Sequence, residues 1–174
     1  MKPALIVDIA LVALVALPTA GRAQAKTDFS GTWALDQAKS DSAPAQGGRG
    51  GRGGGRGGGV ATSLTIQQTP AQLTIERAAG ELPTSAVYKM DGSESTNTLG
   101  DIFLSRSKVS WDGPKLVITT AKPMGQGPNG MMSEDSKEVY SLEGGVLTIV
   151  ATTRSTPNTS NREQTRKLVY NKRS

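Results

Sequence analysis

The sequence predicts an all-β protein built as a single antiparallel up-and-down β-barrel of about eight to ten strands. Tight-turn dipeptides separate runs rich in β-branched residues, at Asp91-Gly92, Asp112-Gly113 and Gly144-Gly145. Such dipeptides are typical of hairpins because the primed turns need positive φ. No stretch of the mature chain has a convincing helical pattern. A sheet of many short antiparallel strands removes its edges most simply by closing, and a two-sheet sandwich is the alternative that the same pattern allows.

Residues 1–25 are typical of a secretory signal peptide. Lys2 precedes an apolar run, and Ala23-Gln24-Ala25 fits the small-x-small rule for cleavage. We therefore expect cleavage after Ala25 and a periplasmic or secreted protein. A membrane anchor is the alternative, but the run is short for a span of about 20 residues, and Asp8 inside it would be costly in lipid.

The first expected strand, at 26–36, leads to an unusual tract. Residues 47–59 contain only glycine and arginine, and such a stretch has no apolar surface to bury, so we expect a disordered insertion between the first two strands. The net charge of +5 falls to +4 without the leader and to +1 without the three arginines of the tract. The body of the domain is therefore nearly neutral, and Arg49, Arg52 and Arg56 are candidates for contact with polyanions; a passive flexible loop is the alternative.

The remaining strands are predicted from runs that flank turn residues, and together with the first they make about nine. Leu73 and Ile75, Leu116 and Ile118, and Leu147 and Ile149 alternate with smaller residues, which places each pair on one face, expected to line the interior. We expect the connection at 122–135 to be a long loop. The expected later strands are 61–68, 72–77, 85–90, 102–111, 115–121, 136–142, 146–154 and 163–171.

The absent residue types exclude several classes of function. The chain of 174 residues has no His and no Cys. Catalytic triads, imidazole or thiolate metal sites, disulfides and lipidated cysteines are therefore excluded. No pair of carboxylates is marked by its spacing as an acid–base couple, so we expect neither an enzyme nor a bound metal or cofactor. One domain, residues 26–174, accounts for the mature length.

The stretch Phe29-Ser30-Gly31-Thr32-Trp33, followed by Asp36 and by Lys39-Ser40, resembles the start of secreted bacterial lipocalin-like (calycin-type) β-barrel proteins of unassigned function. This resemblance implies a closed antiparallel barrel that holds a small ligand. It also implies that Trp33, with Gly31 before it, closes one end of the barrel beneath a cation from the end of the last strand, for which Lys172 and Arg173 are the candidates. A cation over the indole would contribute about 0.5–2 kcal/mol.

Larger side chains scattered over successive strands are candidates for lining a ligand pocket. In a narrow barrel the same residues would simply fill the core. Arg77 and Lys122 follow inward-facing positions and would suit an anionic head group at the mouth; alternatively, each is paired with Glu76, Glu81 or Asp101 at a solvated strand end. The candidate lining residues are Tyr88, Met90, Phe103, Trp111, Ile118 and Tyr170.

The sequence therefore favours a non-enzymatic, exported protein that binds a small, partly hydrophobic ligand in the barrel. The alternative is an envelope or extracellular interaction protein that contacts polyanions through its Arg/Gly-rich loop. In either case we expect a monomer with no transmembrane segment in the mature chain.

Overall fold

The computed structural model describes residues 26–41, 60–79, 82–98, 104–127, 130–156 and 163–173, and every regular element in these ranges is a β-strand. The predicted leader, the Arg/Gly tract with Arg49, Arg52 and Arg56, and Phe103 lie outside the described residues, so what was predicted for them stays a prediction. Within the described ranges, no helix is long and apolar enough to span a membrane.

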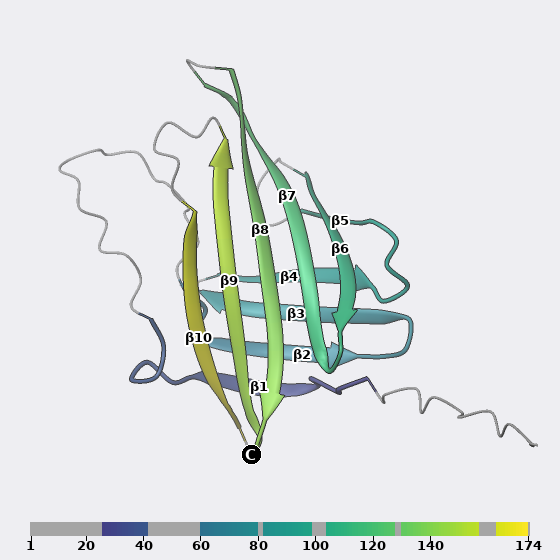
Figure 1. Cartoon of the computed structure of the whole chain (residues 1–174), viewed down its shortest axis with the longest axis vertical. Coiled ribbons are helices and arrows are strands. Elements are labelled where there is room, and N and C mark those ends of the chain that lie inside the picture. The colour runs from purple at the N-terminus through teal and green to yellow at the C-terminus, as the bar shows by residue number, and fades with distance from the viewer. Residues whose placement is uncertain are drawn as a thin grey trace, which may run out of the picture.

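Ten strands form one antiparallel sheet that curls into a barrel (Figure 1). Its order is β4-β3-β2-β1-β10-β9-β8-β7-β6-β5, so β1 pairs with both β2 and β10, and the two ends of the domain meet. The predicted fold class, a single antiparallel up-and-down barrel, is confirmed. The strands are β1 (Gly31–Leu35), β2 (Ser63–Gln68), β3 (Gln72–Ala79), β4 (Leu82–Lys89), β5 (Ser95–Thr98), β6 (Leu104–Asp112), β7 (Lys115–Gly127), β8 (Gly130–Glu143), β9 (Val146–Thr156) and β10 (Gln164–Lys172).

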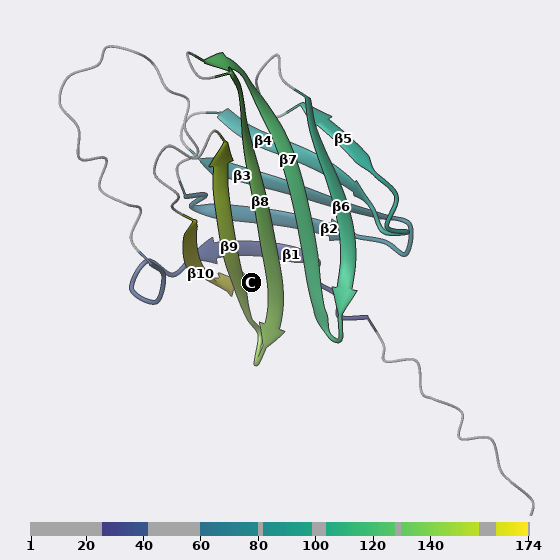
Figure 2. The same cartoon turned by 45° about the horizontal axis from the view of Figure 1, so that its top comes forward.

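The two walls of the barrel cross each other. In Figure 1 strands β2 to β4 run behind β7 to β10, and the turned view of Figure 2 shows the same two groups facing one another. Side chains alternate between interior and solvent along each strand, as the pleat requires. The expected inward pairs are buried: Leu73 with Ile75, Leu116 with Ile118, and Leu147 with Ile149.

The barrel has two unlike ends. At one end the strands are joined by short turns, including Gly113 and the pair Gly144 and Gly145, all with positive φ as the predicted hairpin turns require. We call this the turn end. We call the other end the open end. There, five strands finish and the next strand begins: β1, β3, β5, β7 and β9. Apart from the last residue of the chain, the residues after residue 41 that the structure does not describe all fall in these five connections.

The structure corrects two expectations. The segment 122–135, expected to be a loop, belongs largely to β7 and β8, which pair as far as Gly127 and Gly130; an irregularity between Pro123 and Gly125 lets the ladder pass the proline. Strand β5 was not expected, because its sequence Ser-Thr-Asn-Thr has no apolar residue to alternate.

Candidate ligand-binding site

The turn end of the barrel is sealed around Trp33. Its ring is 1% exposed, its Nε1 donates a hydrogen bond of 3.1 Å to the Phe29 carbonyl, and Lys172 Nζ lies 5.5 Å from the ring centroid. Gly31 has φ +143°, a backbone conformation that other residues rarely adopt, and Lys172 Cε lies 2.8 Å from the place that a Cβ would take. The backbone N–H of Arg173 donates to the Thr32 carbonyl, while its side chain is exposed.

Most of the candidate lining residues are part of a packed core next to this seal. Trp111 is half-buried and stacks on Phe29 at a centroid distance of 6.2 Å, and the Tyr170 hydroxyl donates to the Ala61 carbonyl at 3.1 Å. These contacts leave the turn-end half of the barrel filled with side chains. The remaining exposed fractions are 4% for Tyr88, 6% for Met90, 1% for Ile118 and 1% for Tyr170.

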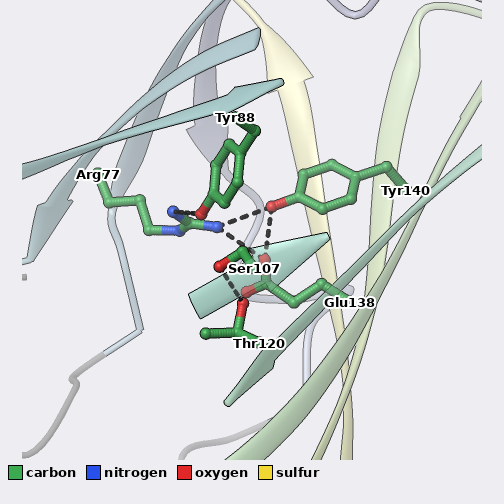
Figure 3. Close-up of polar contacts among 6 residues, drawn as sticks. All are labelled: Arg77, Tyr88, Ser107, Thr120, Glu138 and Tyr140. Atoms are coloured by element: carbon green, nitrogen blue, oxygen red, sulfur yellow. Dashed lines mark hydrogen bonds and ion pairs between the residues drawn. The ribbon is translucent and has the colours of Figure 1, made fainter. Parts of the chain in front are cut away.

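Arg77 forms the centre of a polar layer inside the barrel (Figure 3). Its Nη2 lies 2.7 Å from Glu138 Oε2 and donates to the Tyr140 hydroxyl at 2.8 Å, and the Tyr140 hydroxyl in turn donates to Glu138 Oε2 at 2.8 Å. Its Nη1 reaches the Tyr88 hydroxyl at 3.5 Å. The strands that carry Arg77 and Glu138, β3 and β8, are five places apart in either direction around the barrel, so this ion pair joins opposite walls.

The electrostatics of the layer keep it as a charged pair with neutral tyrosines. Burial raises the pKa of Tyr140 and of Tyr88, so both hydroxyls stay protonated at neutral pH. Burial alone would lower the pKa of Arg77, but the Glu138 carboxylate and the two tyrosine oxygens outweigh it and hold that pKa well above its ordinary value. Arg77 therefore stays charged. The contacts described use three of its five N–H hydrogens.

Solvent reaches this layer although the core beneath it is sealed. The side chains of Arg77 and Glu138 keep 20% and 27% of their surface exposed, whereas Ile75, the inward neighbour of Arg77 on the same strand, is fully buried. Lys122 lies farther toward the open end, on the inward face of β7 and half-buried, where it pairs in register with Glu134. The structure thus places Arg77 and Lys122 on the interior side, but Arg77 pairs with Glu138 and not with Glu76. The other two partners considered, Glu81 and Asp101, lie outside the described residues.

The buried polar residues of the described chain gather on one side of the barrel. Strands β4 and β5 are joined by side chains: Asn97 accepts from the Val87 N–H at 2.7 Å and donates to the Val87 carbonyl at 3.0 Å, and Ser95 accepts from the Lys89 N–H at 2.8 Å. We call this the β4–β5 seam. The buried polar residues are Ser95, Asn97, Ser105 and Ser107, all on β5 and β6.

Sequence reasoning did not find Glu138, Tyr140, Ser107 or Thr120 as site residues. A carboxylate or hydroxyl on an inward position of a strand has the same appearance in the sequence as one that faces solvent. The signal that was present is parity: Glu138, Tyr140 and Leu142 occupy every second position of one strand, but the intervening Val139 and Ser141 do not form a clearly polar face. In the described part of the chain, no group of three or more Asp and Glu side chains is placed to hold a metal ion.

These features define the chain as an up-and-down β-barrel with one sealed end and a charged, solvent-accessible interior layer. No family model and no curated protein sequence matches it. Among solved structures it is similar to apo lipid binding protein 8 (LBP-8) of Caenorhabditis elegans, with 14% identity, a TM-score of 0.46, and coverage of 64% of this chain and 70% of that one.

It is also similar to two secretory abundant heat soluble proteins of Ramazzottius varieornatus. One, solved from a dimer sample, has 15% identity and a TM-score of 0.46 over 64% of this chain and 70% of that one. The other, protein 4, has 18% identity and a TM-score of 0.43 over 64% and 69%.

Proposed function

We propose that this protein binds a small molecule, without catalysis, in the open-end half of its barrel, with a polar group of the ligand against Arg77 and Glu138. One observation carries the proposal: the Arg77–Glu138 pair points into the barrel, and yet both side chains remain partly exposed. If the pair served only to join the two walls, well-packed apolar residues of similar volume would do so as well or better, because they avoid the cost of desolvating two charges.

The same observation moves the site away from the apolar residues first considered. Tyr88, Met90, Ile118 and Tyr170 are almost fully buried by one another and by their neighbours, so they leave no surface for a ligand body. The polar layer is the floor of the accessible interior. Its unused arginine hydrogens would donate to an acceptor group on the ligand, while Glu138 would accept from a ligand hydroxyl or amine.

We further propose that the protein is exported, on the support of the pattern in residues 1–25. Ligand and export are tested together by native mass spectrometry of the protein recovered from the envelope fraction or medium of the cells that make it. We expect the mass of a polypeptide whose first residue is Lys26. We also expect a discrete additional mass that is lost on denaturation.

The role of Arg77 is tested with the variant Arg77→Met, which keeps length and removes the charge. Loss of the charge-assisted contacts is expected to weaken binding of the co-purified ligand about tenfold or more. The matched control is Arg106→Met on the outer face of β6, whose side chain is 71% exposed. Equal affinity of the two variants would place the ligand elsewhere, and the absence of any bound mass would contradict the proposed function.

A further inference from the structure

The interior of the barrel changes character from one register row to the next. Toward the turn end, one inward row runs across β6 to β10 and is apolar or aromatic throughout: Trp111, Leu116, Tyr140, Ile149 and Leu168. The next row toward the open end is mixed: Val109, Ile118, Glu138, Ala151 and Arg166.

The row after that carries only hydroxyls across five strands. We call it the hydroxyl row. Successive members are cross-strand partners, so their Cα atoms lie about 5 Å apart. Ser107 and Thr120 already share a hydrogen bond of 2.8 Å in which either oxygen is able to donate (Figure 3). The row consists of Ser95, Ser107, Thr120, Ser136 and Thr153, from β5 to β9.

The next row toward the open end is polar as well. Asn97 pairs in register with Ser105 on one side of the wall, and Lys122, Glu134 and Ser155 are partners on the other. In these two rows, over the described parts of β5 to β9, no position holds an apolar side chain. Ser95, Ser107 and Thr120 already have hydrogen-bond partners in the protein. An acyl chain lying against this wall would keep water from the half-buried hydroxyls of Ser136 and Thr153, which costs free energy for each group that is desolvated.

We propose that the ligand is a small polyhydroxylated molecule of the sugar or polyol class, held by the half-buried members of the hydroxyl row, Thr120, Ser136 and Thr153, and by Arg77 and Glu138. This inference rests on the proposed function and names its ligand class. Each protein hydroxyl both donates and accepts, as each ligand hydroxyl does, and a carboxylate facing a guanidinium supplies a strong acceptor and a strong donor. A compact molecule with hydroxyls on several sides would form hydrogen bonds with the hydroxyl row and with the Arg77–Glu138 pair at the same time.

The chain offers a matched pair of variants for the test. Thr120 and Thr153 belong to the hydroxyl row on either side of Ser136, while Thr119 and Thr152 are their immediate neighbours on the outer face. The double variants Thr120→Val/Thr153→Val and Thr119→Val/Thr152→Val make the same chemical change on opposite faces of the same strands. Circular dichroism and thermal melting check that both variants remain folded.

Titration calorimetry of the purified full chain with maltose, sorbitol and glucuronate, and with laurate as the apolar probe, decides the ligand class. We expect at least one of the hydroxylated probes to bind, and the inward double variant to lose about tenfold in affinity, as two hydrogen bonds would supply. The outward double variant should bind as the unchanged protein does.

Each other outcome is informative. Laurate binding that depends on Arg77, with none of the hydroxylated probes bound, would overturn the ligand class and leave the proposed function intact. Equal loss, or no loss, in both double variants would overturn the site. If no probe binds and native mass spectrometry of the cell-derived protein shows no bound molecule, both the ligand class and the proposed function are wrong.

Discussion

Arg77 and Glu138 form an ion pair that differs from the other ion pairs of the described chain in joining two strands on opposite walls of the barrel. The pair is flanked by neutral tyrosine hydroxyls and has the core on one side. Its partial exposure lowers the cost of desolvation, since water still reaches both groups. The coupling free energy between the two side chains is therefore expected to be larger than that of an ion pair on the surface and smaller than that of a fully desolvated pair.

A double-mutant cycle tests that expectation. We predict a coupling free energy of about 1–2 kcal/mol between Arg77→Met and Glu138→Gln, measured by urea unfolding, because either single variant leaves a charged or polar group without its partner. The matched cycle is Arg106→Met with Glu94→Gln, an outer pair 3.8 Å apart whose side chains are 71% and 48% exposed. There the coupling should be below about 0.5 kcal/mol, and equal values in the two cycles would contradict the internal role of Arg77.

Strands β4 and β5 are the place where the sheet is held by side chains. The carboxamide of Asn97 acts as a substitute peptide group, because it accepts from the Val87 N–H and donates to the Val87 carbonyl. Ser105 fixes the same residue from the other side by donating to the Asn97 carbonyl at 3.0 Å. Two hydrogen bonds from one side chain thus replace a segment of backbone ladder, and they hold the β4–β5 seam together with the Lys89 N–H to Ser95 contact.

Removal of this side chain is predicted to loosen the seam locally. Asn97→Ala should cost about 1–3 kcal/mol in unfolding free energy, as expected for two lost hydrogen bonds of a buried group. In hydrogen exchange, the amide of Val87 should lose protection, while the amides of β2 and β3, which pair through their backbones, keep theirs. The control is Asn171→Ala, whose exposed side chain bonds Asp36; unchanged exchange at Val87 in Asn97→Ala would show that the seam is held by other contacts.

For the whole molecule, the apolar residues that face the interior of the barrel could be predicted from the sequence, whereas most of the polar residues that face it could not. Leu116 with Ile118 and Leu147 with Ile149 are recognised because apolar residues that alternate along a strand have one physical explanation, burial on a shared face. Hydroxyl residues such as Ser107 and Thr120 are compatible with either face, and only the register brings them together. Arg77 was predicted as an inward cation from its parity with Ile75, but its partner Glu138 lies 61 positions along the chain.

The stability of the whole barrel should depend on pH through its tyrosines. The chain has three, and burial raises the pKa of each, that of Tyr170 to about 12. An unfolded tyrosine has a pKa of about 10, so above that pH the unfolded chain releases protons that the folded barrel retains. The contribution of the tyrosines to the free energy of unfolding should therefore stay constant up to about pH 10. Between about pH 10 and 12 the free energy of unfolding should fall, by about 2–3 kcal/mol from Tyr170 alone.

Unfolding free energies from urea titrations across this range, with tyrosinate absorbance followed in parallel, measure the effect. Tyr170→Phe should be less stable at neutral pH, because it loses the hydrogen bond to the Ala61 carbonyl, but its stability should fall less steeply with rising pH. Lysines titrate in the same range, and the difference between the two proteins removes their contribution. Tyrosinate absorbance near pH 10 that the folded protein shows and folded Tyr170→Phe lacks would mean that water reaches the Tyr170 hydroxyl, and that the accessible interior extends below the Arg77 layer to the turn end.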